Sequence, residues 1–154
     1  MYLLLWLSGW LLFMAAAERA VHRYVQHRWL FRLNFTHVWF FRHAVLHHRD
    51  GRNDLNVDLE SSYVLYVAGP IIAAAACFDL GGAVVLAAGF LFYGFLWTKL
   101  HRAIHDIENN WARRLWCYPA IERHHLAHHR QPGRNFGAVF FFTDRIFGTC
   151  AVNV

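Results

Sequence analysis

The sequence has few cysteines and few charged residues. Its three cysteines, Cys77, Cys117 and Cys150, lie far apart and form no C-x-x-C pair, which excludes a disulfide scaffold and a thiolate zinc ribbon. Charged residues make up only 16% of the 154 residues, against about 25% in a typical soluble domain. The hydrophobic fraction is 57% and the aromatic fraction 18%, which excludes a disordered chain. The net charge of +5 allows a nucleic-acid partner, but the apolar content indicates a membrane instead.

Two parts of the chain lack basic residues altogether. All 15 lysines and arginines lie in residues 19–60 and 99–154, and none lies in 1–17 or 61–98. The first gap has about the length of one membrane span and the second about that of two. We therefore predict an all-α integral membrane protein with about three transmembrane helices. They cover residues 2–17, 61–78 and 83–98.

The distribution of charge also predicts a topology. Asp79 is the only charged residue of the second apolar run, and we expect the turn of a helical hairpin at Asp79–Gly82. By the positive-inside rule the N-terminus faces out and both basic segments face the cytoplasm. A signal peptide is the weaker interpretation of the first run, because nothing charged precedes Glu18. Residues 28–48 mix aromatic side chains with arginine and are expected to form an interfacial helix or a re-entrant segment.

Histidine is unusually frequent, with 12 residues, and every one lies in the two basic segments, six in each. Eleven fall into four clusters, and only His37 stands apart. The clusters are His22 and His27; His43, His47 and His48; His101 and His105; and His124, His125, His128 and His129. We interpret His37 as a packed or solvated side chain. The hairpin holds the two histidine-bearing segments on one side of the membrane.

Helical spacing gives these clusters a meaning. Residues four apart on an α-helix differ by about 40° in direction, so three histidine pairs should each point the same way. These are His43 with His47, His101 with His105, and His125 with His129. His22 and His27, five apart, should diverge by about 140° and flank a site or reach two metals. We expect residues 105–129 to be helical, with Pro132 and Gly133 stopping that helix.

Two or three imidazoles on one helical face suit a late first-row metal. Ten candidate ligands are more than one metal ion can coordinate, whereas two ions can use them. Other roles for the histidines fit the pattern less well. A structural zinc site is complete with four ligands, and a pH sensor uses only one or a few histidines. Binding of lipid headgroups does not require repeated histidine pairs at helical spacing. Haem ligands, or those of a metal carrier, should lie within the spans, which contain no histidine. A non-catalytic assembly subunit should lack some of the metal ligands, and none is missing here. The pattern favours a dinuclear site with O₂ chemistry on a substrate from the bilayer, without the Glu-x-x-His motif of soluble di-iron bundles.

The order of these motifs, with their C-terminal tail, resembles the fatty acid hydroxylase/sterol desaturase superfamily of integral-membrane di-iron oxygenases. The family has H-x(3,4)-H, H-x(2,3)-H-H, a hydrophobic hairpin and further pairs that end in H-x-x-H-H. Its tail, N-[YF]-G followed by D-R-[LI]-F-G-T, is similar to Asn135–Gly137 and Asp144–Thr149. The chain departs from the family's pattern in its small number of spans, in the spacing of His43 and His47, and in the extra His124. This extra residue permits an alternative pairing of His124 with His128. The compact layout is similar to bacterial carotenoid hydroxylases as well.

The resemblance implies one domain over residues 1–154 with a cytoplasmic, histidine-rich helical cap that holds two iron ions, or zinc as isolated. It implies hydroxylation of a lipid C–H bond, fatty acyl or sterol, with O₂ as co-substrate. A desaturase or a carotenoid hydroxylase on the same scaffold is the alternative, and a metal carrier without catalysis ranks below both. We expect no catalytic residues beyond the metal ligands. These are His22, His27, His43, His47, His48, His101, His105, His125, His128 and His129.

The sequence lacks a G-x-G-x-x-G motif and has too few cysteines for an iron–sulfur cluster. The electron donor is therefore expected to be a separate acidic protein, of the ferredoxin or cytochrome b5 type, drawn to the basic cytoplasmic face. Anchoring to anionic lipids is the alternative role of that face. Asp106 and Asp144 are our preferred hydrogen-bond partners for the ligand imidazoles. The C-terminal residues Ala-Val-Asn-Val carry no retention signal, which favours a bacterial inner membrane over the endoplasmic reticulum. Oligomeric state is left open.

Overall fold

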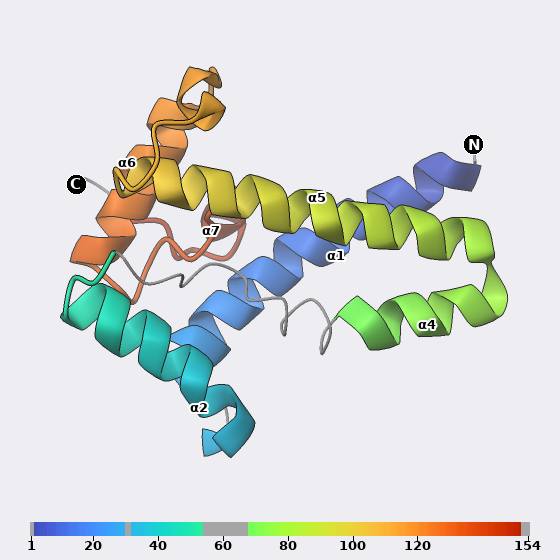
Figure 1. Cartoon of the computed structure of the whole chain (residues 1–154), viewed down its shortest axis with the longest axis horizontal. Coiled ribbons are helices and arrows are strands. Elements are labelled where there is room, and N and C mark those ends of the chain that lie inside the picture. The colour runs from blue at the N-terminus through green and yellow to red at the C-terminus, as the bar shows by residue number, and fades with distance from the viewer. Residues whose placement is uncertain (1, 30–31, 54–67, 152–154) are drawn as a thin grey trace.

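The computed structural model describes residues 2–29, 32–53 and 68–151. Within these ranges all regular structure is helical and no strand occurs, as predicted. The elements in chain order are α1 (Tyr2–Ala20), η1 (Val21–Gln26), α2 (Asn34–Phe40), η3 (Phe41–Arg49), α4 (Gly69–Phe78), α5 (Leu80–Ile104), η5 (Trp111–Arg114), α6 (Tyr118–Arg130) and α7 (Thr143–Ile146). The helices η1 and η3 are π-helical, and η5 is a 3₁₀ helix. Figure 1 shows their arrangement.

Two helical stretches, Tyr2–Gln26 and Leu80–Ile104, are long and apolar enough to cross a membrane. Only 28% and 33% of their most apolar windows are buried within the protein, whereas the core helix of a soluble protein is mostly buried. Large apolar side chains such as Leu12 (75% exposed) and Leu91 (67% exposed) point outward. Exposed apolar side chains along such long helices are typical of a surface in contact with a membrane. The two helices therefore indicate a membrane protein.

The predicted span over residues 61–78 is only partly within the described residues. Positions 61–67 lie outside them, and α4 itself has ten residues, fewer than the about 20 that a straight span needs. A count of three spans stays a prediction. The following span is longer than predicted at both ends, since α5 runs from Leu80 to Ile104 and carries His101 within the same helix.

The hairpin turn is tighter than predicted. Asp79 alone separates α4 from α5, and Gly81 and Gly82 already belong to the first turn of α5. The Asp79 carboxylate accepts the backbone N–H groups of Gly81 (3.1 Å) and Gly82 (2.9 Å), which caps the helix. Tyr2 donates its hydroxyl to the same carboxylate at 2.6 Å. The start of α1 and the hairpin turn therefore lie at the same end of the molecule (Figure 1).

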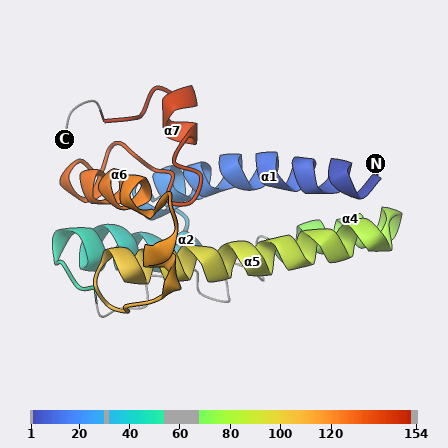
Figure 2. The ribbon, with the colours of Figure 1, turned by 90° about the horizontal axis from the view of Figure 1, so that it is seen from above.

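Helices α1 and α5 pack closely because two glycines of α5 face two tryptophans of α1. A Cβ atom on Gly82 would lie 2.4 Å from the Trp6 ring, and one on Gly89 would lie 2.5 Å from the Trp10 ring. Trp10 is buried in the apolar core that α1 and α5 share. Figure 2 shows that α1 and α5 both extend from the end with the N-terminus toward the end where α6 lies.

The segments beyond the apolar helices agree with the prediction in one place and differ in another. Residues 28–48 were expected to form an interfacial helix or a re-entrant segment, and α2 there runs directly into η3 as one continuous helix from Asn34 to Arg49. Residues 105–129 are not one helix, because α5 ends at Ile104 and α6 begins only at Tyr118. Asp106 has a left-handed backbone (φ 56°), and the Asn110 side chain caps η5 by accepting the Ala112 N–H at 2.9 Å. These local conformations break the helix, and α6 then ends at Arg130, as predicted.

Candidate metal centre

The structure brings all ten predicted ligand residues together in two compact groups. The first, called the His22 group, consists of His22, His27, His43, His48 and His128. The second, called the His47 group, consists of His47, His101, His105, His125 and His129. Within each group one ring nitrogen per residue lies within 4.8 Å of all the others. Six of the ten side chains are 3% exposed or less, so both groups are largely closed to water.

The π-helix η1 turns His22 and His27 toward the same point. The His27 N–H hydrogen-bonds the His22 carbonyl five residues back, at 3.2 Å. In such a helix, residues five apart share a face, and the two ring centroids are 5.0 Å apart. The predicted divergence of about 140° is wrong because it assumed α-helical spacing.

The longer π-helix η3 supplies both groups. Residues His43 and His48, again five apart, belong to the His22 group, with their Nε2 atoms 3.2 Å apart. His47 turns to the other group instead and lies with its Nε2 atom 3.2 Å from that of His101. The prediction that His43 and His47 point the same way is therefore wrong, and π-helical geometry is the reason.

The other two pairs follow the α-helical prediction. His125 and His129 on α6 have Nε2 atoms 3.2 Å apart, and the rings of His101 and His105 lie 4.6 Å apart between centroids. The Nε2 atom of His105 is 3.0 Å from that of His125, which joins α5 to α6. One residue of α6, His128, joins the His22 group. Helices η3 and α6 thus both contribute to both groups.

Hydrogen bonds at the outer ring nitrogens show that lone pairs converge inside the His22 group. The Nδ1 atom of His22 is 2.5 Å from the Phe136 carbonyl, and that of His128 is 2.6 Å from the Arg134 carbonyl. A carbonyl only accepts, so each Nδ1 carries the proton and each Nε2 has a free lone pair. The Nε2 atom of His22 nevertheless lies 2.9 Å from that of His43, and the Nε2 atoms of His27 and His128 are also 2.9 Å apart.

Converging lone pairs in a buried site call for a cation. Two nitrogens about 2.1 Å from one ion and at right angles to each other are separated by about 3.0 Å. The closest Nε2 pairs of the two groups span 2.9–3.2 Å. The arrangement therefore fits a late first-row metal ion in each group, and all-imidazole donors are typical of zinc, copper, iron and nickel sites.

The electrostatics of the site keep the imidazoles neutral. Burial lowers the pKa of His105 to about 4, and burial together with the neighbouring His105 lowers the pKa of His47 to about 3. Burial and the surrounding imidazoles lower the pKa of His129 to about 2 and hold the pKa values of His43 and His125 well below the usual range. At neutral pH these rings are uncharged, which is the form that binds metals.

The remaining predictions about histidines and acids have mixed outcomes. His37 is exposed, stacks on Phe41 and lies outside both groups, as predicted. His124 also lies outside both groups, so its suggested pairing with His128 is wrong. Asp106 is exposed and forms an ion pair with Arg113, so its predicted contact with an imidazole is wrong.

The predicted role of Asp144 takes a different form in the structure. The Asp144 carboxylate binds His124 rather than one of the ten ligand candidates, with Oδ2 3.0 Å from Nε2. Burial alone raises the pKa of Asp144, but hydrogen bonds from His124, Thr149 and Gly137 lower it to about 2. The carboxylate is therefore ionised and fully buried beside the metal centre.

Some of the supporting groups were missed in the sequence. The carbonyls of Arg134 and Phe136 that hold His128 and His22 leave no side-chain signal, although the tail motif contains one of them. Glu18 was interpreted only as the end of the first span. Its carboxylate in fact accepts the backbone N–H groups of Ala138 (3.1 Å), Val139 (2.7 Å) and Phe140 (2.8 Å). This acidic side chain ties α1 to the tail one turn before His22.

The family model for fatty acid hydroxylase matches residues 7–149. The matched range contains both histidine groups and the tail that supports them. The chain belongs to the fatty acid hydroxylase family. No curated protein and no solved structure matches it significantly.

Membership of the fatty acid hydroxylase family indicates lipid hydroxylation by a metal-dependent membrane oxidoreductase. The two histidine groups are consistent with this activity, because they supply ten neutral nitrogen donors next to the apolar helices. The ten histidines of the two groups lie on or directly beside η1, η3, the C-terminal end of α5 and α6, and these elements lie at one end of α1 and α5 (Figure 1).

Proposed function

We propose that this protein is a di-iron oxygenase that hydroxylates a C–H bond of a membrane lipid, fatty acyl or sterol in type. The observation that carries the proposal is the pair of adjoining five-imidazole groups at one end of two long apolar helices. In the overall reaction one atom of O₂ enters the C–H bond to form an alcohol, and the other leaves as water. Two electrons and two protons are consumed.

The His22 group would hold one iron ion and the His47 group the other. When bound, the irons supply the redox chemistry that activates O₂. Five imidazoles leave one position of a six-coordinate ion for a small ligand. The chain itself fixes the geometry, since each ring projects from a helix or from the first residue beyond its end, and backbone carbonyls keep the Nε2 lone pairs of His22 and His128 free of protons.

Apolar rings around the imidazoles would exclude water from the reacting atoms. Trp97, 5% exposed, stacks on His101 with ring centroids 4.6 Å apart. Phe136, 1% exposed, lies with its ring 5.9 Å from that of His22 and 5.8 Å from that of His128. A dry site strengthens electrostatic interactions and limits side reactions. We propose that the lipid enters laterally beside α1 and α5, where it is already dissolved.

The electrons would come from a separate protein. Exposed arginines on and after α6, at Arg123, Arg130 and Arg134, give the histidine end of the molecule a positive surface. An acidic donor of the ferredoxin or cytochrome b5 type is attracted to such a surface, and salt weakens the attraction. We propose that this surface faces the cytoplasm of a bacterial inner membrane. Turnover that does not fall as the ionic strength rises would speak against this donor site.

The test is a product analysis with labelled oxygen. Membranes that contain the wild-type protein and a reducing system are incubated with ¹⁸O₂, and the lipids are analysed by mass spectrometry. We expect a lipid alcohol that carries one ¹⁸O atom. His105→Ala and His128→Ala should abolish this product, whereas His37→Ala, outside both groups, should retain it. An alkene without ¹⁸O would assign the protein to desaturation, and an unlabelled lipid pool would contradict oxygenase activity.

A further inference from the structure

Two ligand candidates of the His22 group are oriented by one short loop. The Nδ1 atom of His22 donates to the Phe136 carbonyl at 2.5 Å, and that of His128 donates to the Arg134 carbonyl at 2.6 Å. An acceptor on the outer nitrogen fixes both the tautomer and the orientation of a metal-binding imidazole. The position of the loop 134–136 therefore determines how well these two rings are placed.

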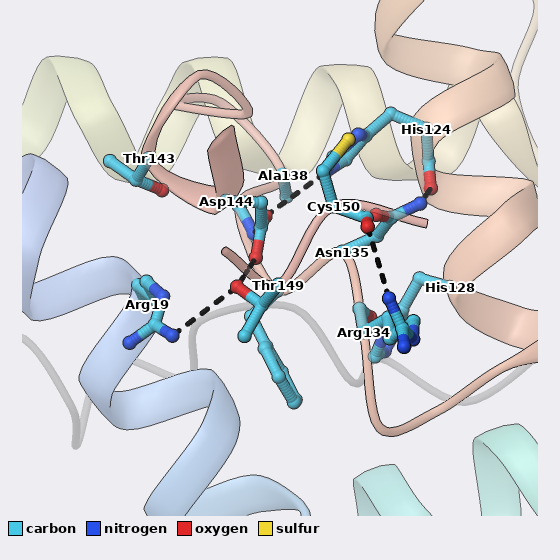
Figure 3. A network of polar contacts seen from close by, with 12 residues as sticks. Arg19, His124, His128, Arg134, Asn135, Ala138, Thr143, Asp144, Thr149 and Cys150 are labelled. Carbon is cyan, nitrogen blue, oxygen red and sulfur yellow. Dashed lines mark hydrogen bonds and ion pairs between the residues drawn. The ribbon is translucent and has the colours of Figure 1, made fainter. Parts of the chain in front are cut away.

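The buried Asp144 carboxylate fixes the C-terminal end of this loop through a hydrogen bond to Gly137. It accepts the Gly137 N–H at 2.7 Å, the His124 Nε2–H at 3.0 Å and the Thr149 hydroxyl at 2.6 Å. Figure 3 shows Asp144 between His124 and Thr149, with Asn135 and His128 close by. Because its side chain is fully buried, each of these donors depends on the carboxylate rather than on water.

Asn135 fastens the same loop on its other side. Its amide nitrogen donates to the His124 carbonyl at 3.1 Å, and its amide oxygen accepts the Ala151 N–H at 2.7 Å. Its backbone N–H donates to the Thr149 carbonyl at 3.0 Å, and its φ of 55° lies in the left-handed region that asparagine tolerates. The loop is thus clamped between α6 and the last residues of the tail.

We propose that Asp144 and Asn135 are positioning residues that set the metal affinity of the His22 group selectively. Both act through the Phe136 and Arg134 carbonyls, and the imidazoles that these carbonyls hold, His22 and His128, both belong to that group. The proposal rests on the proposed metal centre. It adds that the two metal sites are unequal, because the C-terminal tail supports one of them.

The experiment measures Zn²⁺ affinity by chelator competition on detergent-purified, full-length protein. Zinc is a suitable probe because it binds imidazole and has no redox chemistry. We expect two bound ions in the wild type. In Asp144→Asn, whose amide group would face N–H and O–H donors, one ion should bind about 10-fold to 100-fold more weakly, while the other keeps its wild-type affinity.

Ligand variants identify which ion is affected. Added to Asp144→Asn, His48→Ala removes a residue of the site that is already weakened, so it should lower the metal content little further. Added to the same background, His105→Ala disables the intact site, so tightly bound zinc should disappear. The reverse assignment would overturn the proposal.

Controls separate positioning from general stability. Asp50→Asn removes an exposed acid that lies two residues after His48 and pairs with Arg49, and it should change neither affinity. His124→Leu removes one donor to Asp144 and should weaken the same single site, whereas His124→Gln can restore that donor and should recover the wild-type value. These milder variants serve if Asp144→Asn does not fold.

The outcomes are distinguishable. Equal weakening of both ions, or no change in either, with two ions in the wild type, would overturn the positioning role and leave the metal centre intact. Fewer than two ions in the folded wild type would overturn the proposed di-metal function itself. Selective weakening of one ion with an unchanged melting temperature supports the proposal.

Discussion

His48 and His129 stack face to face, with ring centroids 4.1 Å apart and planes inclined by 17°. His48 belongs to the His22 group and His129 to the His47 group. The two groups therefore adjoin each other, and this contact between η3 and α6 is the shortest of the five ring contacts between them. This relationship places the two groups side by side in one candidate metal centre.

The first prediction concerns this pair. His48→Ala should weaken metal binding in the His22 group, and His129→Ala should weaken it in the His47 group. After a mild chelator wash, the number of bound ions per chain should therefore fall from two toward one in each variant. The double variant should retain neither ion tightly. His37→Ala is the control, because His37 is exposed and outside both groups, and it should keep two. Loss of both ions in either single variant would argue against separate sites.

The second prediction concerns the packing of α1 on α5. Gly89→Ala places a Cβ atom 2.5 Å from the Trp10 ring, so the tryptophan must shift and the free energy of unfolding should fall by about 1–3 kcal/mol. Gly94→Ala on the same helix meets nothing within 4 Å and should be neutral or slightly stabilising. Thermal unfolding in detergent compares the two. Equal melting temperatures would contradict the close contact.

The third prediction concerns Glu18. Glu18→Ala leaves the N–H groups of Ala138, Val139 and Phe140 without their acceptor, at a cost of about 3 kcal/mol or more. Glu18→Gln keeps an acceptor oxygen and should lose less. The melting temperature should therefore be highest for the wild type, lower for Glu18→Gln and lowest for Glu18→Ala. An alanine variant as stable as the wild type would show that the tail does not depend on Glu18.

The fourth prediction concerns pH. The pKa values of His105, His47 and His129 are about 4, 3 and 2 in the folded protein, below the roughly 6.5 of an unfolded chain. The unfolded chain therefore binds more protons below about pH 6.5, and the stability of the metal-free protein must fall as pH decreases. Its melting temperature should be flat from about pH 7.5 to 8.5 and drop steadily toward pH 5. A constant value down to pH 5 would mean that these rings are not buried neutral.

The sequence was sufficient for the ligand candidates because chemistry and spacing agreed. Imidazoles confined to the basic segments predicted the ten residues that meet in space, and the pairs on α5 and α6 follow α-helical spacing. The partition between sites was not predictable in the same way. His22 and His27, and likewise His43 and His48, share a site only because η1 and η3 are π-helical, and a π-helix has no clear signal in local sequence.

The supporting structure was harder to predict than the ligands. Asp144 was identified from the tail motif, but its partner is His124, and it reaches the ligand rings only through backbone carbonyls. Backbone acceptors carry no residue-type signature, so no sequence pattern could show them. Asp106, adjacent to His105 in the chain, was a reasonable candidate, yet its left-handed backbone conformation sets it beside Arg113 instead.

The central claim is that each chain binds two metal ions, one in each five-imidazole group. The most direct test is elemental mass spectrometry of detergent-purified protein expressed in iron-rich medium, with the protein concentration measured by amino-acid analysis. We expect close to two metal ions per chain, wholly or partly iron. Two zinc ions would also support a centre with two sites, but they would not identify the metal that the working enzyme uses. One ion or none in folded protein would contradict the central claim.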